Sequence, residues 1–204
     1  MAGCIGGTAA PATGSGGGGI AGCPTAAPAH APAGSTATAT IATPKGTIVI
    51  ALQADLAPAA VGNFIALARC GYYDGVVFQR LVSGFVIQGG DGQYGRSPNV
   101  DMNRVGSGSP GYTIDDDPVH TPYVRGVVAM ARTAKPHSGS SQFFIVLDDS
   151  AAGSLSQANT YAIMGHVTTG MDVVDAIAAM ATHGPQNDQA DVPVPMTKVT
   201  ITTP

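Results

Sequence analysis

The sequence predicts a mainly β domain in which a closed antiparallel barrel is accompanied by two helices. Short apolar runs with alternating or β-branched residues recur from about residue 38 onward, which is typical of strands. Only two stretches have helical spacing of their apolar residues, and Gly-rich segments connect the elements. With 204 residues, 44% of them hydrophobic, the chain is long enough for one full-sized domain with a sizeable core.

The predicted domain begins with a hairpin and a helix. Residues 38–43 and 47–52 alternate or are rich in β-branched side chains, and a Pro-Lys-Gly turn lies between them. A helix is predicted from Pro58 to Gly71, because proline suits the first helical turn and the following apolar residues have helical spacing.

The later elements are also mostly strands. They are predicted near 77–82, 85–89, 126–131, 142–147 and 161–167, with a last strand at about 196–203. The second helix is predicted from about Met171 to Met180, where an apolar stripe is formed by Val173, Val174, Ile177 and Ala178.

Residues 1–37 are almost entirely Gly, Ala, Pro, Thr and Ser, so we predict a disordered leader or tether ahead of the domain at 38–204. Within it, residues 1–4 and 20–23 resemble the end of a bacterial lipoprotein signal, in which the cysteine is lipidated. Cys4 is the candidate lipidation site and would hold the domain at the cell envelope. The alternative is a plain leader on a cytoplasmic protein.

The three cysteines do not indicate a disulfide framework. Cys4 and Cys23 lie in the predicted leader. Cys70 follows a helical pattern, and we interpret it as a small buried hydrophobe rather than a reactive thiol.

Composition and motif spacing argue against several classes of function. The net charge is −4 and the nine Lys and Arg residues are scattered, which disfavours a nucleic-acid surface. No apolar run approaches the roughly 18–20 residues that span a bilayer. The five histidines have no paired metal spacing, and residues 115–117 are interpreted as a solvated turn rather than a calcium loop. Two Gly-x-Gly-x-x-Gly segments, 90–95 and 106–111, precede no helix and are interpreted as loop glycines. We therefore expect no metal and no cofactor.

The stretch from Phe78 to Gly90 places polar groups in two short apolar runs. Alternation predicts that Phe78 and Arg80 point the same way. An arginine on an apolar surface is costly unless a partner satisfies it, and Gln88 on the next run is the candidate partner. The alternative is a structural ion-pair arginine, although no acidic residue lies on the same strand. A second stretch, 130–144, also sets polar groups beside aromatic residues.

These two stretches resemble the cyclophilin family of peptidyl-prolyl cis-trans isomerases, and specifically its bacterial branch. The similarity lies in Phe-Gln-Arg at 78–80, Phe-x-x-Gln-Gly-Gly at 85–90, Met-Ala-Arg-Thr at 130–133, Ser-Gln-Phe-Phe at 141–144 and the run 161–167. It extends from about residue 38 to 203, with Gln79 standing where histidine is usual. The resemblance implies a closed barrel of eight strands capped by two helices, with the active groove on the outer face.

The resemblance also implies roles for individual residues. Arg80 is the expected catalytic residue, and Gln88 is expected to orient both Arg80 and the substrate carbonyl. The expected proline pocket consists of Phe85, Val86, Met130, Phe144 and Leu155, with Val86 replacing the usual methionine. The expected contacts along the groove edge are Ala131, Arg132, Thr133 and Gln142, and Tyr161 occupies the place of a histidine in eukaryotic members.

The function implied is acceleration of X-Pro bond rotation in unfolded or flexible proteins, by a monomer whose partners are proline-containing polypeptides. Retention of Arg80, Phe85, Gln88 and Phe144 together favours the enzyme. One alternative is a non-catalytic module that holds proline-containing segments, which the departures at Gln79 and Val86 keep open. Another is a structural domain on an envelope tether.

Overall fold

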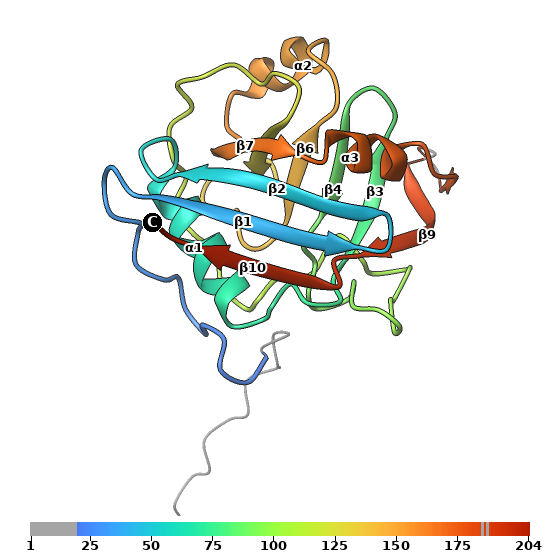
Figure 1. Cartoon of the computed structure of the whole chain (residues 1–204), viewed down its shortest axis with the longest axis horizontal. Coiled ribbons are helices and arrows are strands. Elements are labelled where there is room, and N and C mark those ends of the chain that lie inside the picture. Colours follow the sequence, from blue (N-terminus) through green and yellow to red (C-terminus); the bar gives the residue numbers. More distant parts are fainter. Residues whose placement is uncertain (1–19, 185, 187) are drawn as a thin grey trace, which may run out of the picture.

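The computed structural model describes residues 20–184, 186 and 188–204, and its elements are shown in Figure 1. The strands are β1 Thr36–Thr43, β2 Gly46–Gln53, β3 Val77–Val82, β4 Val86–Gly89, β5 Val127–Met130, β6 Phe143–Val146, β7 Ile163–Thr169, β8 Thr182–His183, β9 Gln189–Pro195 and β10 Lys198–Thr202. The helices are α1 Pro58–Arg69, α2 Ala151–Ala158 and α3 Met171–Ala178.

The strands form one antiparallel sheet in the order β10-β1-β2-β7-β5-β6-β4-β3-β9-β8. In Figure 1, β10, β1 and β2 cross the front of the molecule, and β3, β4 and β6 run behind them at a steep angle. The sheet thus curls around an inner core that α1 and α3 also enter. The largest fully buried side chains are Tyr72, Tyr73, Tyr123, Phe64, Phe78, Phe143, Ile41, Ile48, Ile50, Leu52, Leu67 and Ile87.

The expected closed eight-stranded barrel is wrong in its details. The described residues form a ten-stranded sheet that hydrogen bonds do not close, since β10 lies at one edge and β8 at the other. The chain between β9 and β10 joins the two sides instead. The Met196 N–H donates to Val76 O at 2.8 Å, and the Thr197 N–H donates to Ala42 O at 2.7 Å. Strand β9 escaped prediction because Pro193 and Pro195 weaken its strand signal.

Both predicted helices are present, and a third, α2, lies between β6 and β7. Helix α1 begins after Ala57, which has no side-chain acceptor for the first helical N–H groups. Asp117 supplies both acceptors from a distant loop: its Oδ1 accepts from Ala59 N at 3.1 Å and its Oδ2 from Ala60 N at 2.8 Å. Asp117 is only 8% exposed, so the prediction of a solvated turn at 115–117 is wrong for this residue.

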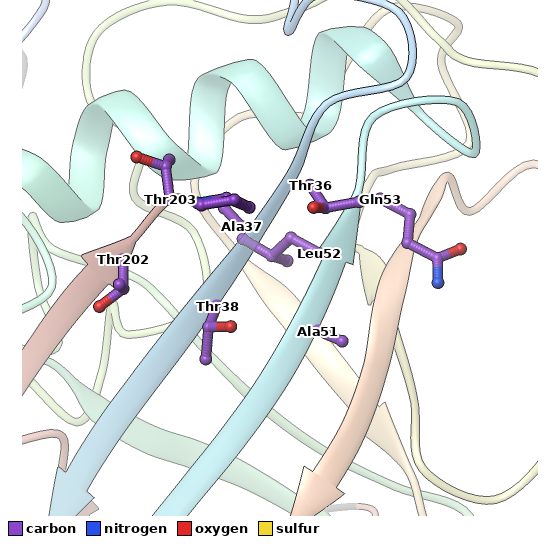
Figure 2. Close-up of a pocket in the computed structure, with 9 residues that line it drawn as sticks. Thr36, Ala37, Thr38, Ala51, Leu52, Gln53, Thr202 and Thr203 are labelled. Carbon is purple, nitrogen blue, oxygen red and sulfur yellow. The ribbon is translucent and has the colours of Figure 1, made fainter.

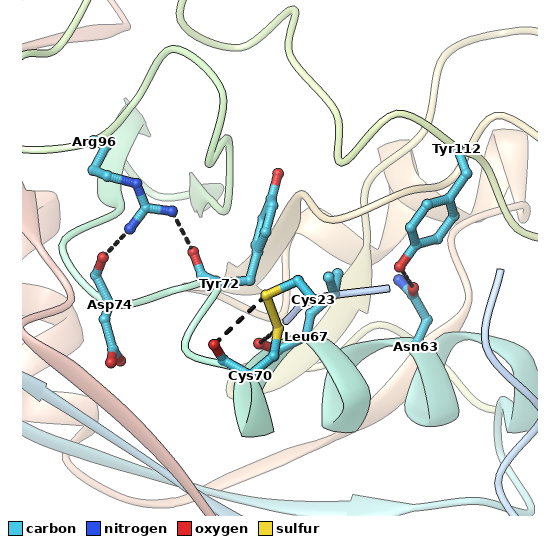
Figure 3. The surroundings of a disulfide bond; sticks show 8 residues. All are labelled: Cys23, Asn63, Leu67, Cys70, Tyr72, Asp74, Arg96 and Tyr112. Carbon is cyan, nitrogen blue, oxygen red and sulfur yellow. Dashed lines mark hydrogen bonds between the residues drawn. A yellow bond between two sulfur atoms is a disulfide. The ribbon is translucent and has the colours of Figure 1, made fainter. Parts of the chain in front are cut away.

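Residues 20–35, which we call the strap, lie against the domain rather than forming part of a disordered leader. Cys23 forms a disulfide with Cys70, with 5.2 Å between the Cα atoms (Figure 3). Further along, the Ala31 N–H donates to Pro58 O at 2.9 Å. A Cβ on Gly62 of α1 would lie 2.5 Å from Ala29 O, so this glycine permits the close approach of the strap.

Residues 20–35 of the predicted leader are therefore packed against the domain, while residues 1–19 lie outside the described residues. The interpretation of Cys70 as a small buried hydrophobe is wrong, because Cys70 is paired with Cys23. The composition of the strap does not predict that it packs against the domain, since it has few large apolar side chains. The strap is held instead by a disulfide and by backbone hydrogen bonds. Cys4 lies outside the described residues, so its lipidation stays a prediction.

Arg96 holds the segment that follows α1 and the disulfide. Its Nη2 donates to Tyr72 O at 2.7 Å and its Nη1 donates to Asp74 O (Figure 3). Burial lowers the pKa of Arg96 and raises the pKa of Tyr72. These contacts fix the approach to β3, which carries the candidate site.

Within the described residues, no helix combines the length and the apolar character needed to cross a membrane. In the same part of the chain, no group of three or more His, Cys, Asp or Glu side chains is arranged to hold a metal ion.

We predict that the disulfide contributes substantially to stability, because it links positions 47 residues apart. In a Cys4→Ser background, the double change Cys23→Ser and Cys70→Ser should lower the free energy of unfolding by about 2–4 kcal/mol. Urea denaturation with and without reductant measures this. Reductant should shift the Cys4→Ser protein and leave the triple variant unchanged. Identical transitions in all four samples would contradict the pairing.

Candidate active site

The outer face of the sheet carries a second apolar cluster, separate from the inner core. Strand alternation produces it, since Phe143 packs in the inner core and Phe144 on the opposite face. This outer cluster consists of Val86, Tyr123, Val127, Ala129, Phe144, Val146, Ala151, Leu155 and Ile163. Partly buried side chains packed against it are Leu56, Val82, Phe85, Val119, Ala131 and Tyr161.

A bulge in β3 places the Arg80 side chain in a polar pocket rather than in the inner core. Phe78 pairs with Gly89 and Arg80 pairs with Gln88, so the register shifts around Gln79. Phe78 points into the inner core, where its ring centroid lies 6.1 Å from that of Phe143. The expectation that Phe78 and Arg80 point the same way is therefore wrong, because the extra residue of the bulge breaks the alternation.

Two glycines of the Gln-Gly-Gly motif make room for the bulged strand. A Cβ on Gly89 would lie 2.9 Å from Val77 O and 3.0 Å from the Phe78 ring. Gly90 has a φ of +100°, and a Cβ there would lie 2.5 Å from Ser141 O. Any other residue at these two positions would push β4 away from β3 or from the segment before β6.

Arg80 forms an ion pair with Asp188, the residue just before β9. The Arg80 Nε lies 2.7 Å from Asp188 Oδ2, and the side chains are 37% and 17% exposed, respectively. Arg80 has no acidic residue on its own strand, and its ion-pair partner lies 108 positions away in the sequence. Gln88, the expected partner, instead donates to Gln142 Oε1 at 3.1 Å.

Three glutamines form a network behind Arg80. Gln142 Oε1 accepts from Gln79 Nε2 at 3.0 Å and from Gln88 Nε2 at 3.1 Å. Gln142 Nε2 in turn donates to Gly106 O at 2.9 Å and to Gly108 O at 3.2 Å. Among the described residues, Gln79 Oε1 is the one buried side-chain nitrogen or oxygen without a hydrogen-bond partner. Gln79, the departure from the family pattern, is thus part of the structure that holds Gln88.

A loop reaching from β4 to this network is organised by Asp91, which is fully buried. Its Oδ1 accepts from Gln93 N at 3.0 Å and Tyr94 N at 2.9 Å. Its Oδ2 accepts from Gly106 N at 2.8 Å and Gly108 N at 2.9 Å. The glycines of the second Gly-x-Gly-x-x-Gly segment therefore bind a carboxylate of the protein itself, in agreement with a loop rather than a nucleotide site.

A polar pocket of about 240 Å³ lies beside Arg80, and Gln88 in its lining pairs with Phe144 of the outer cluster in the β4–β6 register. Its lining consists of Gln79, Arg80, Gln88, Val105, Gly106, Gly184, Asp188 and Gln189. Sequence reasoning missed Asp188, Gln189 and the 105–106 loop, because nothing local to these residues indicates that they approach Arg80.

Most of the expected proline-pocket residues lie together. Of the five, Val86, Phe144 and Leu155 belong to the outer cluster and Phe85 packs against it. Tyr161, which was expected at the site as well, also packs against the outer cluster. The Phe144 and Tyr161 rings meet edge to face, with centroids 5.4 Å apart and planes at 84°.

The Tyr123 hydroxyl is hydrogen-bonded to the backbone of Tyr161. The Tyr123 hydroxyl donates to Tyr161 O at 3.0 Å and accepts from Tyr161 N at 3.1 Å. Burial raises the pKa of Tyr123, which further favours the neutral hydroxyl that donates in this contact. The aromatic wall therefore rests on a fixed backbone.

Met130 and Arg132 do not fit the places expected for them. Met130 is 3% exposed and belongs to the inner core, because Ala129 and Ala131 take the outward positions on either side of it. The Arg132 guanidinium donates to Asp116 Oδ2 at 2.8 Å and to carbonyl oxygens of the turn at 133–135. The Arg132 side chain is 9% exposed, so it supports this turn rather than the groove.

Thr133 also belongs to the turn, since its hydroxyl bonds to Ser138 Oγ at 2.9 Å. Ala131 stays at the rim of the outer cluster, and its N–H donates to Gln142 O at 2.9 Å. Of the expected groove-edge residues, Ala131 and Gln142 are thus the two next to the site.

A different pocket, of about 320 Å³, lies across β10, β1 and β2 (Figure 2). Its lining consists of Thr36, Ala37, Thr38, Ala51, Leu52, Gln53, Thr202, Thr203 and Pro204. The side chains are hydroxyl, amide and apolar, so they supply no acid, base or charge for catalysis. Arg80 lines the other, polar pocket, and Gln88 in that pocket pairs with Phe144 of the apolar outer cluster.

The family model for cyclophilin type peptidyl-prolyl cis-trans isomerase/CLD matches residues 38–201. The chain is 40% identical over 156 residues to the peptidyl-prolyl cis-trans isomerase cyp18 of Streptomyces antibioticus, covering 74% of this chain and 89% of the relative. It is 37% identical over 158 residues to peptidyl-prolyl cis-trans isomerase B of Escherichia coli, covering 76% of this chain and 91% of the relative. It is 39% identical over 157 residues to a probable peptidyl-prolyl cis-trans isomerase of Brucella abortus, covering 71% of this chain and 77% of the relative.

A cyclophilin type peptidyl-prolyl cis-trans isomerase of Cryptosporidium parvum has a similar crystal structure, with a TM-score of 0.67 and 25% identity. That similarity covers 83% of this chain and 99% of the solved one. The extent of the family match, the bacterial relatives and the shared fold lead to one conclusion: the chain belongs to the cyclophilin-type peptidyl-prolyl cis-trans isomerase family.

Proposed function

We propose that this peptidyl-prolyl cis-trans isomerase acts on X-Pro bonds in unfolded or flexible proteins, with Arg80 as its catalytic residue. The observation that carries the proposal is the outward position of Arg80 beside the apolar outer cluster. No nucleophile or metal is needed, because the reaction is a rotation about a partial double bond.

The chemical task is to lower a barrier of about 18–20 kcal/mol that arises from amide resonance. Without a catalyst, X-Pro exchange takes tens to hundreds of seconds. An acceleration to milliseconds, about 10⁵-fold, requires roughly 7 kcal/mol of transition-state stabilisation. When the bond is twisted, the proline nitrogen becomes pyramidal and regains a lone pair that can accept a hydrogen bond. Donation to this lone pair stabilises the transition state more than the planar ground state.

Arg80 can supply that donor. Its ion pair with Asp188 goes through Nε, so the two terminal amino groups are not required for this contact. Gln88 is the residue directly opposite Arg80 in the β3–β4 pairing, and its amide group is oriented by Gln142. In this proposal the Gln88 amide orients the substrate carbonyl while Arg80 acts on the nitrogen.

The proline ring would be held by the outer cluster. Phe144 forms the floor, Tyr161 meets it edge to face, and Val86 and Leu155 supply aliphatic walls. Because these groups are apolar and packed, they can fix the ring while the carbonyl side of the bond turns.

We also propose that the domain works in an oxidising compartment. The supporting observation is the Cys23–Cys70 disulfide, since disulfides persist mainly in secreted, envelope or periplasmic proteins. Of the two locations considered from the sequence, this favours the cell envelope over the cytoplasm.

We predict that Arg80→Ala lowers kcat/KM by about 10²–10³-fold, as loss of a transition-state donor does in other enzymes. Two-dimensional NMR exchange on a peptide with one X-Pro bond measures the rate. Arg69→Ala serves as the control, because Arg69 is an exposed arginine at the end of α1. Equal rates for wild type and Arg80→Ala would overturn the mechanism. Binding of the peptide by wild type without acceleration would favour the non-catalytic module.

We predict that Phe144→Leu raises KM by about tenfold, because an aromatic contact contributes about 0.5–1.5 kcal/mol beyond its buried area. The neighbouring change Phe143→Leu is the matched control, since Phe143 lies on the opposite face of β6 in the inner core. Phe143→Leu should lower the melting temperature and leave KM close to the wild-type value. A larger effect on KM from Phe143→Leu than from Phe144→Leu would place the proline pocket elsewhere.

A further inference from the structure

Asp188 is tied to the strand that carries Arg80 by both backbone and side chain. The Leu81 N–H donates to Asp188 O at 2.7 Å, which places Asp188 at the residue next to Arg80. The Asp188 carboxylate then reaches Arg80 Nε, also at 2.7 Å. Because the backbone of Asp188 is also bonded to β3, its carboxylate is held close to Arg80.

The segment behind Asp188 is held as well. Gln189, the first residue of β9, pairs with Arg80 in the β3–β9 register. Its side-chain Nε2 donates to Met102 O at 2.6 Å. Asp188 is therefore supported by β3 on one side and, through Gln189, by the loop that Asp91 organises.

The geometry of an arginine gives this contact a directional effect. An arginine side chain has many rotamers, but its guanidinium is planar and rigid. A partner that fixes Nε therefore also limits the directions of both terminal amino groups. Asp188 is 17% exposed at its side chain, so its carboxylate is drawn to the neighbouring cation more strongly than a fully solvated one would be.

We propose that Asp188 is the positioning residue of the active site: it holds Arg80 through Nε so that the terminal amino groups face the groove. This inference rests on the proposed catalytic role of Arg80. Asp188 acts only through Arg80 and touches no reacting atom. Misplacement of Arg80 should then reduce the stabilisation of the twisted bond and leave peptide binding to the apolar pocket largely intact.

The test uses the full chain and NMR exchange on a peptide with one X-Pro bond, with kcat and KM determined separately. Asp188→Ala removes charge and acceptor, and kcat should fall about tenfold with KM changing less than about twofold. Asp188→Asn keeps an oxygen that can accept from Nε, so it should retain more activity than Asp188→Ala. Its smaller structural change keeps the test usable if Asp188→Ala folds poorly.

The matched control is Asp191→Ala on the same strand. Asp191 Oδ1 lies 2.6 Å from His183 Nδ1, and both side chains are about half exposed, so it is also a paired aspartate of β9. Asp191→Ala should leave kcat within about twofold of wild type, because Arg80 keeps its partner. An equal loss in Asp188→Ala and Asp191→Ala would indicate a general effect on β9 and overturn the inference.

A double-mutant cycle separates this inference from the proposed function. In an Arg80→Ala background, Asp188→Ala should cause no further loss of kcat, since the group that it positions is gone. If Arg80→Ala is impaired but Asp188→Ala equals or exceeds wild type, the catalytic role stands and the positioning role falls. A full additional loss in the double variant would also overturn the positioning role. If wild type gives no acceleration, the proposed function fails, and the inference fails with it.

Discussion

The β-bulge at Gln79 separates two side chains that a regular strand would direct to the same face. Phe78 fills the inner core, and Arg80 emerges beside the outer cluster. Without the extra residue, either the arginine would be driven into an apolar interior or the phenylalanine would leave it, and both are unfavourable. The position of Arg80 in the polar pocket therefore depends on a local break in the pleat, and Gly89 and Gly90 supply the space that the bulge needs.

Around this bulge, polar groups are arranged in a continuous network. The Asp91 carboxylate accepts from the backbone N–H groups of Gly106 and Gly108. The carbonyls of the same two glycines accept from the Gln142 side chain. Gln142 in turn accepts from Gln79 and Gln88. On the other side of Arg80 lies its ion-pair partner Asp188, the residue just before β9. The inner core carries most of the apolar burial, so these polar contacts can orient a few side chains without having to hold the fold together.

The sequence predicts features that depend on neighbouring residues and misses those that depend on distant ones. Strand and helix positions, and the grouping of Phe85, Val86 and Phe144, follow from local alternation and a dense set of motifs. Asp188 lies 108 residues from Arg80, and Cys23 lies 47 residues from Cys70, so no local pattern could pair them. Strand alternation, applied around Ala129 and Ala131, could have placed Met130 in the inner core.

The central claim is that Arg80 faces the twisting bond while the outer cluster holds the proline ring. A crystal structure of the chain with a bound proline-containing peptide tests this most directly. We expect the proline ring on Phe144, a terminal amino group of Arg80 directed at the X-Pro amide, and Arg80 Nε still on Asp188. A peptide bound outside the outer cluster, or an Arg80 guanidinium turned away from the X-Pro bond, would contradict the account.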